Sequence, residues 1–473
     1  MVEHYKPHKY KAGEMSLPER FAEYFSRLSE REAVAEANRC LYCYDAPCVV
    51  ACPTHIDIPS FIRKIATGNV KGSARTILES NLLGATCARV CPVQELCEGS
   101  CVLARDQKPI MIGRLQRYAT DWAWSRGCKY FDPGAPNGLK VAVVGCGPAG
   151  LSCAGELAKA GFAVTCFESR SMAGGLDTYG IVVFREPVEV SLAEVKMVEE
   201  LGVSIRTGVT VGKEIGWDEL VDSFDAVFIG VGMAAVPLLS IPGEELDQVV
   251  DGLEFIEQTK IKALDSITVG QRVCVVGAGN TAIDCATIAR RLGAERVAIV
   301  YRRSEAEMPC YHFEYQFALS EGVSFMFLTQ PVAVLGTGCV EALKCIRMDL
   351  GPPDSLGRRS PVVVPDSEFV LPADMVIRAI GQKKRYDALE QLALLGVKSN
   401  NGYITVALES RQTDNPKVFA GGDCIRSTGE ASTVAAVQDG KIAARSICAQ
   451  LSERARLKHV SADHSRRSSQ EST

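Results

Sequence analysis

The 473-residue sequence lacks long apolar runs and a strong net charge. No apolar stretch approaches the roughly 18–20 residues that a transmembrane helix needs. The segment from Met1 to Met15 is polar and lacks the apolar core of a signal peptide. The formal net charge of -5 is too small to favour nucleic acid or an anionic membrane as a partner. These absences predict a globular protein of the reducing cytoplasm that binds neither nucleic acid nor membrane.

Histidine is also scarce, with six residues, whereas cysteine is abundant, with nineteen. Eight cysteines fall between residues 40 and 101, and the first run has the spacing C-x2-C-x4-C-x3-C-P. Thiolates bind iron–sulfur cores, and a [4Fe–4S] cluster needs about four of them. The cysteines therefore predict two [4Fe–4S] clusters. The eight residues are Cys40, Cys43, Cys48, Cys52, Cys87, Cys91, Cys97 and Cys101.

Disulfides and zinc are the alternative roles for these cysteines. Disulfides require an oxidising compartment. Structural zinc usually shows two Cys pairs separated by a dozen or more residues, whereas here the first four cysteines span 13 positions. Proline follows both Cys52 and Cys91. In ferredoxins the cysteine before proline ligates the other cluster, so Cys52 is expected to ligate the second cluster.

The first of two glycine motifs lies between a strand and a helix. Residues 140–144 are expected to form a strand, Gly145 to Gly150 fit G-x-G-x-x-G, and a helix should follow at 151–160. The next strand ends at Glu168. Glycines let the backbone approach a pyrophosphate, the helix N-terminus attracts it, and the acid can bind a ribose diol. In this context the motif predicts a dinucleotide site.

The pattern recurs at 277–282, between strands expected at 272–276 and 296–300. The second of these strands is followed by Arg302 and Arg303 instead of an acid. A guanidinium group pairs with a 2′-phosphate in a bidentate fork. The second site is therefore predicted to take NADPH in preference to NADH, with solvated arginines as the alternative.

Further strands organise the C-terminal half. Two strands that end in glycine, within 225–232 and 374–381, are expected to be crossing points between an inserted domain and its host. A later strand ends in Gly422 and Asp423, and a helix is expected at 431–444. Two dinucleotide motifs on one chain imply two bound dinucleotides.

These motifs together resemble the flavin disulfide-reductase superfamily with two dinucleotide folds. The resemblance implies that the first motif binds FAD, that Asp423 binds the ribityl chain, and that the middle domain binds NAD(P)H. The redox-active C-x4-C of those reductases is missing, since the stretch reads Gly174-Gly175-Leu176-Asp177, so electrons are expected to leave through the clusters. The residues implied for FAD are Gly145, Gly147, Ala149, Gly150, Glu168, Gly175, Leu176, Arg185, Gly422, Asp423 and Thr433.

For the nicotinamide nucleotide, the resemblance carries over a second set of residues. One family position that contributes a phosphate-binding arginine falls near Pro309 here, and Arg303 could substitute for it. NADPH and NADH therefore both remain open as the donor. The residues implied for NAD(P)H are Gly277, Gly279, Asn280, Thr281, Arg302, Arg303, Ala379 and Gly381.

The cysteine segment resembles more closely the N-terminal half of dihydropyrimidine dehydrogenase, through residues 39–48, 57–62 and 113–121. In bacteria that half occurs as a separate subunit beside an FMN-bearing chain, and the broader family includes the glutamate synthase small subunit. The resemblance implies one cluster held by Cys40, Cys43, Cys48 and Cys101. It implies a second held by Cys52, Cys91, Cys97 and Gln116. Cys87 would then be a neighbour, and Cys87 in place of Gln116 is the alternative.

The expected fold is α/β, with two Rossmann-like dinucleotide-binding domains, one inserted in the other, preceded by an α-helical iron–sulfur domain. The polar C-terminal tail is expected to be disordered. The predicted boundaries are 1–135 for the domain with two [4Fe–4S] clusters, 136–265 for the first part of the FAD-binding domain, 266–372 for the NAD(P)H-binding domain, 373–451 for the second part of the FAD-binding domain, and 452–473 for the tail.

The predicted function is hydride transfer from NAD(P)H to FAD, followed by one-electron transfer through two [4Fe–4S] clusters. The resemblance implies that the acceptor is the FMN/iron–sulfur catalytic subunit of dihydropyrimidine dehydrogenase, which reduces uracil or thymine to 5,6-dihydropyrimidines. The small subunit of glutamate synthase, or a related NAD(P)H:ferredoxin-type transhydrogenase, is the alternative. A redox-sensing or scaffold protein that keeps the cofactors is a third hypothesis. No catalytic side chain is predicted, because the proton donor should reside on the partner.

Overall fold

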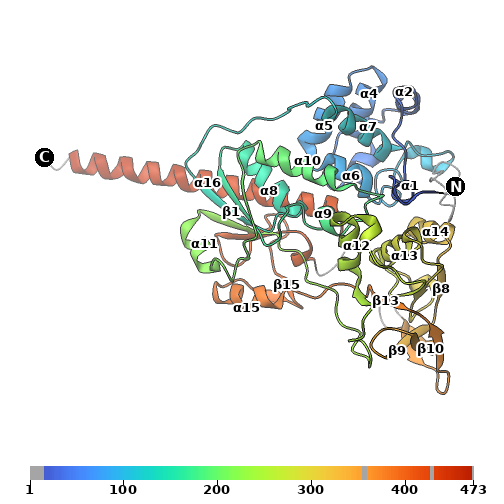
Figure 1. The fold of residues 1–473 in the computed structure, drawn as a ribbon. Helices are drawn as coiled ribbons and strands as arrows, with labels where there is room; N and C mark the ends of the chain where they lie inside the picture. The colour runs from blue at the N-terminus through green and yellow to red at the C-terminus, as the bar shows by residue number, and fades with distance from the viewer. Residues whose placement is uncertain (1–14, 354–358, 427–430, 471–473) are drawn as a thin grey trace. The chain divides into compact units, whose positions relative to one another are not determined.

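The computed structural model of the protein describes three stretches of the chain, residues 15–353, 359–426 and 431–470. They fall into two compact units, each with a five-stranded parallel sheet (Figure 1). The predicted α/β class, with one dinucleotide-binding domain inserted in the other after a helical domain, is confirmed. The first unit combines the described residues up to Ser26 with Thr178–Val188 and Ala234–Lys383, and the second contains Arg27–Asp177, Glu189–Met233 and the described residues from Lys384 onward.

The second unit begins with a helical region, named here the cysteine domain. Its helices begin where polar caps satisfy free amides: Ser29 accepts a hydrogen bond from the Glu32 amide in a capping box, and Asp57 accepts one from the Ser60 amide. Phe61, in the middle of α4 (Ile58–Ala66), is fully buried in the hydrophobic core of the cysteine domain. The helices are α2 (Glu30–Ala37), α3 (Pro47–Val50), α4 (Ile58–Ala66), α5 (Val70–Ser80), α6 (Gly84–Val90), η1 (Val102–Arg105) and α7 (Ile112–Trp124).

The same unit continues as the first dinucleotide domain. Its parallel sheet has the order β16-β4-β1-β2-β3, with the fully buried segment 141–144 at its centre, and α8 and α16 pack side by side (Figure 1). The strands are β1 (Lys140–Val144), β2 (Ala163–Glu168), β3 (Ser204–Thr207), β4 (Ala226–Ile229) and β16 (Val418–Ala420). The helices are α8 (Pro148–Lys159), α9 (Leu176–Tyr179), α10 (Val188–Glu199), α11 (Trp217–Ser223), α15 (Tyr386–Leu394), η4 (Asp423–Ile425) and α16 (Thr433–Gln470), and a small hairpin consists of β14 (Ser399–Asn400) and β15 (Tyr403–Ile404).

The first unit is built on the second dinucleotide domain, whose sheet has the order β5-β13-β6-β7-β8. A four-stranded antiparallel sheet is appended to it. The parallel strands are β5 (Val249–Asp251), β6 (Arg272–Val276), β7 (Arg296–Val300), β8 (Ser324–Met326) and β13 (Met375–Arg378), and the antiparallel ones are β9 (Thr329–Leu335), β10 (Ala342–Pro353), β11 (Arg359–Val363) and β12 (Phe369–Pro372). The helices are α1 (Leu17–Arg20), α12 (Gly252–Ile261), η2 (Leu264–Ser266), α13 (Asn280–Leu292), η3 (Glu305–Glu307) and α14 (His312–Ser320).

The two crossing points lie close to the predicted glycine-ended strands. The units change over after Met233 and after Lys383, and the two crossing segments pair through a 2.8 Å hydrogen bond from the Ala234 amide to the Lys383 carbonyl oxygen. The predicted boundary at 265/266 differs from this division, because β5 pairs in parallel with β13 and so draws residues from 234 onward into the first unit.

The ends of the chain also differ from the predicted domains. The described residues up to Ser26 belong to the first unit instead of the cysteine domain, because Phe21 lies in the hydrophobic core of that unit and the Tyr24 amide donates a 2.7 Å hydrogen bond to the Phe184 carbonyl oxygen. The segment 452–470, predicted to be disordered, continues α16 as helix. It contains no glycine or proline that would end a helix. The rest of that tail, 471–473, lies outside the described residues. Of the described helices, none is both long and apolar enough to cross a bilayer.

Candidate cofactor sites

Four of the predicted cluster ligands line one pocket of the cysteine domain. Cys40, Cys43, Cys48 and Cys101 line a pocket that is open to solvent, with a volume of about 370 Å³ when the open part is included. Its other walls are almost entirely apolar, with Ile58, Pro59, Ile62, Val102, Leu103, Ile110 and Ile112 among them. A pocket with four thiols and an apolar wall fits an iron–sulfur cluster held by cysteine thiolates. These are the four residues that the resemblance assigns to one cluster.

The thiols of this pocket influence one another. Burial, together with the neighbouring Cys101 and Cys40 thiols, raises the pKa of Cys48 to about 12. Burial also raises the pKa of Cys40, with Cys101 and Cys43 adding to the effect. A bound metal reverses this preference for the protonated thiols, because it binds thiolates and displaces their protons. In the described part of the chain, no three His, Cys, Asp or Glu side chains form a site for a single metal ion.

The second predicted set is more deeply buried. Cys52 and Cys97 are both buried, and burial together with the nearby Glu98, Cys91 and Cys52 holds the pKa of Cys97 well above its usual value. Glu98 Oε1 accepts a 3.0 Å hydrogen bond from the Gly113 amide. This bond ties the first turn of α7 to the loop that carries Cys97.

Both candidates for the remaining ligand contact α6. Gln116, on α7, is buried and its Nε2 donates a 2.6 Å hydrogen bond to the Gly84 carbonyl oxygen at the start of α6. Cys87 is buried within α6, and its hydrogen bond with Cys91 and its burial both raise its pKa. All three residues therefore lie at α6: Cys87 is within this helix, Cys91 follows it directly, and Gln116 bonds to its first residue.

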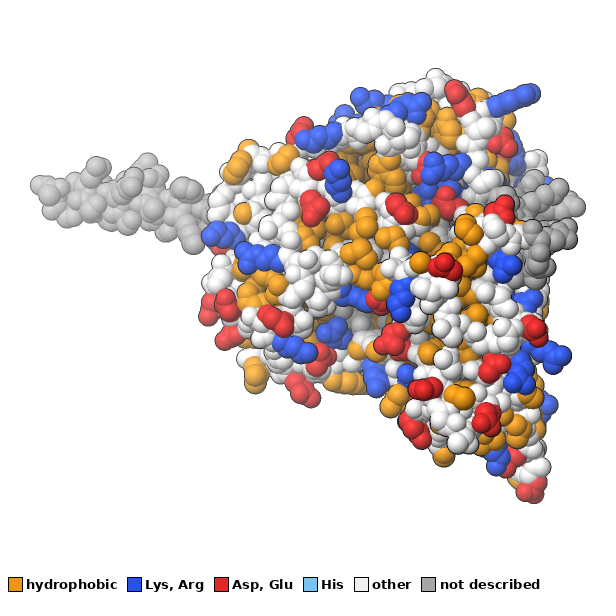
Figure 2. All heavy atoms as spheres, in the orientation of Figure 1, with side chains coloured by type: hydrophobic (Ala, Val, Ile, Leu, Met, Phe, Trp, Pro, Cys, Tyr) orange, Lys and Arg blue, Asp and Glu red, His pale blue; other side chains and the backbone are white. Residues whose placement is uncertain are grey.

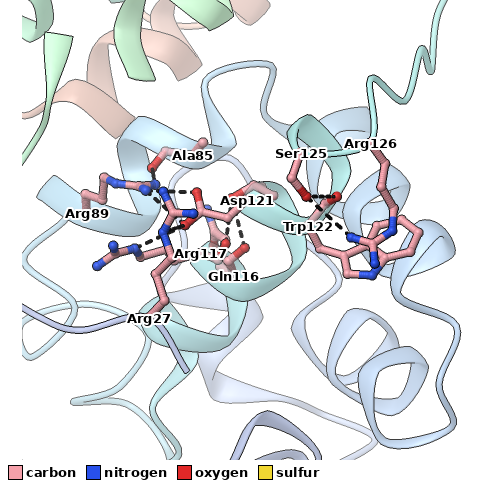
Figure 3. Close-up of polar contacts among 10 residues, drawn as sticks. Arg27, Ala85, Arg89, Gln116, Arg117, Asp121, Trp122, Ser125 and Arg126 are labelled. Atoms are coloured by element: carbon pink, nitrogen blue, oxygen red, sulfur yellow. Dashed lines mark hydrogen bonds and ion pairs between the residues drawn. The ribbon is translucent and has the colours of Figure 1, made fainter. Parts of the chain in front are cut away.

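Guanidinium groups surround Asp121, one turn after Gln116 on α7 (Figure 3). Asp121 pairs with Arg89 at 2.8 Å, with Arg27 at 3.2 Å and with Arg117 at 3.4 Å. The Arg89 and Arg117 side chains are almost fully buried. Arg117 follows Gln116 directly in the sequence and Arg89 precedes Cys91 by two residues, and cations favour an anionic group nearby.

Two buried side chains of the first dinucleotide domain reach the cysteine domain. Glu194, on α10, accepts hydrogen bonds from the Ala85 and Thr86 amides at 2.8 and 3.3 Å, and so caps the N-terminus of α6. Burial raises the pKa of Glu194 to about 8. Lys441, on α16, donates to the Thr54 carbonyl oxygen at 3.2 Å and to that of Ser80. The sequence offered no signal for either residue beyond its place in an expected helix.

The glycine loop of the first dinucleotide domain has the tight backbone that its motif predicts. Gly145 has a φ of +92°, and a Cβ there would lie 2.5 Å from the Gly230 carbonyl oxygen. A Cβ on Gly175 would lie 2.7 Å from the Cα of Gly147. Buried Glu168 accepts hydrogen bonds from the Cys146 and Arg170 amides at 3.0 and 2.9 Å. A bare backbone beside a fixed carboxylate fits the pyrophosphate and ribose of a dinucleotide.

The Gly-Gly-Asp turn packs on this loop. Gly422 has a φ of +78°, and a Cβ there would meet Ala149 at 3.2 Å. Asp439, which the sequence analysis did not single out, accepts a 2.9 Å hydrogen bond from the Gly422 amide and pairs with Arg411 and Arg426. Burial raises the pKa of Asp423. The turn is thus held by a buried ionic cluster, with Asp423 next to it.

The remaining residues predicted for FAD divide between the units. Thr433 donates a 2.8 Å hydrogen bond to Asp177, which follows Leu176 by one residue. Arg185 instead belongs to the other unit, where it pairs with Glu314 at 2.5 Å and with Asp284 at 3.5 Å.

The second dinucleotide domain brings its own predicted residues together. Gly277 has a φ of +125°, and a Cβ there would lie 2.2 Å from the Ala379 carbonyl oxygen. Asn280 begins α13 and accepts a 3.1 Å hydrogen bond from the Tyr311 amide. Thr281 follows it in the first turn, and Gly381 lies beyond Ala379 with a φ of +96°.

Both arginines predicted to bind a 2′-phosphate follow the end of β7. Arg302 is exposed and Arg303 is half-buried. Pro309, at the position where the family contributes an arginine, lies 3.9 Å from the Cβ that Gly279 would carry. The structure thus keeps two guanidinium groups at the strand end, beside the second glycine loop.

One face of the molecule carries charges of both signs (Figure 2). On the face shown in Figure 2, Lys and Arg side chains lie among Asp and Glu side chains instead of in one block. Around the pocket with four thiols, however, three large apolar side chains are exposed: Leu41 at 61%, Val50 at 77% and Tyr44 at 100%. Such exposed apolar groups are typical of surfaces that bind other proteins.

A thiol-lined helical domain followed by two nested dinucleotide folds defines a flavin- and iron–sulfur-dependent oxidoreductase. Residues 18–128 match the family model described as dihydropyrimidine dehydrogenase domain II with a 4Fe-4S cluster. Residues 139–440 match the pyridine nucleotide-disulphide oxidoreductase family. The chain belongs to this pyridine nucleotide-disulphide oxidoreductase family and carries an iron–sulfur domain in front of it. It is an NAD(P)H-dependent oxidoreductase that uses FAD and a [4Fe–4S] centre.

Two relatives from Escherichia coli K12 are equally similar to the chain. The glutamate synthase [NADPH] small chain is 36% identical over 444 residues, which cover 90% of this chain and 93% of the relative. The NAD-dependent dihydropyrimidine dehydrogenase subunit PreT is 36% identical over 415 residues, covering 88% and 93%. The solved structure of Mycobacterium tuberculosis FprA in complex with NADPH shares the fold, with a TM-score of 0.54, 20% identity and coverage of 67% of this chain and 85% of that one.

Proposed function

We propose that the chain is the electron-input subunit of a bacterial dihydropyrimidine dehydrogenase. It would oxidise NAD(P)H and pass single electrons to a separate subunit that reduces uracil or thymine. The observation that carries this proposal is the pocket lined by Cys40, Cys43, Cys48 and Cys101, in the same compact unit as the first glycine loop. When bound, FAD accepts the hydride and each cluster carries one electron at a time.

The cofactor assignments follow from the residues described above. Gly145, Gly147, Glu168 and Asp423 would hold FAD, and Gly277, Asn280 and Arg302 would hold NAD(P)H. Cys40, Cys43, Cys48 and Cys101 would hold one [4Fe–4S] cluster, and Cys52, Cys91, Cys97 and Gln116 a second. None of these side chains is needed as a general acid or base, because hydride transfer depends on positioning of the two nucleotides.

The surroundings of the two cysteine sets support an order for the electrons. Lys441 of the first dinucleotide domain contacts the carbonyl oxygen of Thr54, two residues after Cys52. The other set lies beside exposed Leu41, Tyr44 and Val50. The second set would therefore accept electrons from the flavin, and the first set would deliver them to a partner bound over the exposed apolar residues.

The small subunit of glutamate synthase is the second candidate, because the glutamate synthase relative is as similar to the chain as the dihydropyrimidine dehydrogenase relative. The two functions differ in the partner and not in the chemistry of this chain. The charge at the end of β7 bears on the nucleotide in both cases, since Arg302 and Arg303 favour a 2′-phosphate.

The test is an anaerobic assay of the chain copurified with the product of its neighbouring gene, with NADPH and NADH oxidation followed at 340 nm. Oxidation that depends on uracil would support the dihydropyrimidine dehydrogenase role. Oxidation that depends on 2-oxoglutarate plus glutamine would move the chain to glutamate synthase. Dye reduction by the isolated chain is the control for the flavin site, and negligible turnover there would favour the redox-sensing or scaffold role.

A further inference from the structure

Lys441 is a buried cation whose ammonium group has, among the residues that the structure describes, only uncharged hydrogen-bond partners. It is 6% exposed, and its Nζ donates to the backbone carbonyl oxygens of Thr54, at 3.2 Å, and of Ser80. The carboxylate that acts on it, Glu156, is itself paired with Lys159 at 2.8 Å. Burial lowers the pKa of Lys441 to about 8.

A buried charge is costly unless a group of opposite charge compensates it. Elsewhere in this unit the compensation is visible, since Arg89 is buried against Asp121 and Arg411 against Asp439. Lys441 has no such contact with any carboxylate in the described part of the chain, and its two carbonyl partners both belong to the cysteine domain. We therefore expect the negatively charged group that compensates Lys441 to belong to the cysteine domain.

Cys52 is the group of the cysteine domain that is placed to supply this counter-charge. Thr54, whose carbonyl oxygen receives the lysine, has its Oγ1 3.4 Å from the Cys52 Sγ. Cys52 also favours the charged form of Lys441. A [4Fe–4S] cluster with three thiolates and one amide ligand carries net negative charge, which grows by one on reduction.

We infer that Lys441 supplies the counter-charge of the cluster bound through Cys52, and is a positioning residue that raises that cluster's reduction potential. A cation nearby stabilises the more negative, reduced state more than the oxidised one. Lys441 would thereby favour the transfer of an electron out of the flavin domain. This inference rests on the proposed second cluster.

Lys417 offers a matched control in the same unit. Its Nζ also donates to two backbone carbonyl oxygens, those of Val221 at 2.6 Å and Phe224 at 3.1 Å. Both partners lie in the first dinucleotide domain, at the end of α11 and just after it. Removal of this amine costs similar hydrogen bonds, but neither of them is made to the cysteine domain.

The experiment is a redox titration of the full chain, purified anaerobically with its clusters and followed by electron paramagnetic resonance. The variants are Lys441→Met, Lys441→Gln, Lys441→Arg and Lys417→Met. We expect Lys441→Met and Lys441→Gln to lower the midpoint potential of one cluster, by an amount equal to about a tenfold change in its equilibrium with the flavin, which is about 59 mV for a one-electron couple. Lys441→Arg and Lys417→Met should leave both midpoints close to those of the wild type.

Iron content separates the possible failures. A wild-type chain with iron for one cluster only would overturn the proposed second cluster and this inference with it. With iron for two clusters, unchanged midpoints in Lys441→Met and Lys441→Gln would overturn the inference alone. A drop in Lys441→Arg as large as in Lys441→Met would also overturn it, because the charge would then not be the cause.

Discussion

The two cysteine sets lie in contrasting surroundings. Cys40, Cys43, Cys48 and Cys101 line an apolar pocket beside Tyr44, which is fully exposed. Cys52 and Cys97 are buried, with Lys441 bonded to Thr54 two residues after Cys52 and with Glu98 near Cys97. By spacing alone the two cysteine sets look equivalent. The folded structure distinguishes them, because exposed apolar side chains lie next to the first set and charged side chains lie next to the second.

Loss of one ligand from either set has the largest expected effect. We expect Cys48→Ser and Cys97→Ser each to lower the iron content from about eight to about four atoms per chain, because each removes a thiolate from a different cluster. Reduction of a dye at the flavin should persist in both variants. The measurement is iron and flavin content of the anaerobically purified protein.

Cys339→Ser is the control for this comparison, because Cys339 is exposed and lies in the other unit. Its iron content should equal that of the wild type. If Cys97→Ser kept all its iron, the buried set would not hold a cluster, and only the pocket with four thiols would remain as a cluster site.

Replacement of the fourth ligand of the buried cysteine set should have the next largest effect. We expect Gln116→Ala to lose about four iron atoms per chain and Cys87→Ala to lose none, because the resemblance assigns the amide to the cluster. Gln116→Cys should keep the iron but lower that cluster's midpoint potential, since a thiolate adds negative charge. Iron analysis and a redox titration measure both effects. The reverse result for the two alanine variants would make Cys87 the ligand.

Local sequence patterns could predict much of this structure. The Ser29 capping box, the strand–glycine–helix units at Gly145 and Gly277, and the crossing points near 233 and 383 all depend on neighbouring residues. The grouping of Cys101 with the first cysteine run was predictable only through the resemblance, because its position in the pocket depends on how the helices pack.

Contacts between distant segments could not be predicted in this way. Glu194 caps α6 across more than a hundred residues of sequence, and Asp439 fixes the Gly422 turn from within α16. Arg185, which the resemblance implies for FAD, pairs with Glu314, a residue 129 positions further along the chain. A side chain whose partner is set by tertiary packing leaves no periodicity in the sequence.

A smaller effect is expected at the exposed apolar residues beside the first cysteine set, Leu41, Tyr44 and Val50, and only when the partner is bound. We expect Tyr44→Asp to slow substrate-dependent NAD(P)H oxidation by the complex about fivefold, because the interface residues whose loss costs more than about 1 kcal/mol are enriched in tyrosine. Dye reduction by the isolated chain should not change. Tyr386→Asp is the matched control, since Tyr386 is also exposed, but on α15. Equal effects of the two variants would argue against a docking role for these exposed apolar residues.

The smallest expected effect concerns Glu194, whose carboxyl group caps the N-terminus of α6. Burial raises the pKa of Glu194 to about 8, while its unfolded value is about 4.3. The folded state thus holds the proton more tightly, so this group's contribution to stability is complete below about pH 4.3 and is lost as the pH rises toward 8. Glu194→Gln keeps an oxygen that can accept from the Ala85 and Thr86 amides, but it cannot ionise.

Glu194→Gln should therefore match the wild type only near pH 4 and exceed it in stability by on the order of 1 kcal/mol or more near pH 8. The measurement is the thermal unfolding midpoint of the cluster-loaded chain across this pH range, under argon. Glu199→Gln, an exposed change on the same helix, should follow the wild type throughout. If Glu194→Gln kept the pH dependence of the wild type, another group would carry it. The contact between α10 and α6 would then contribute through its hydrogen bonds alone.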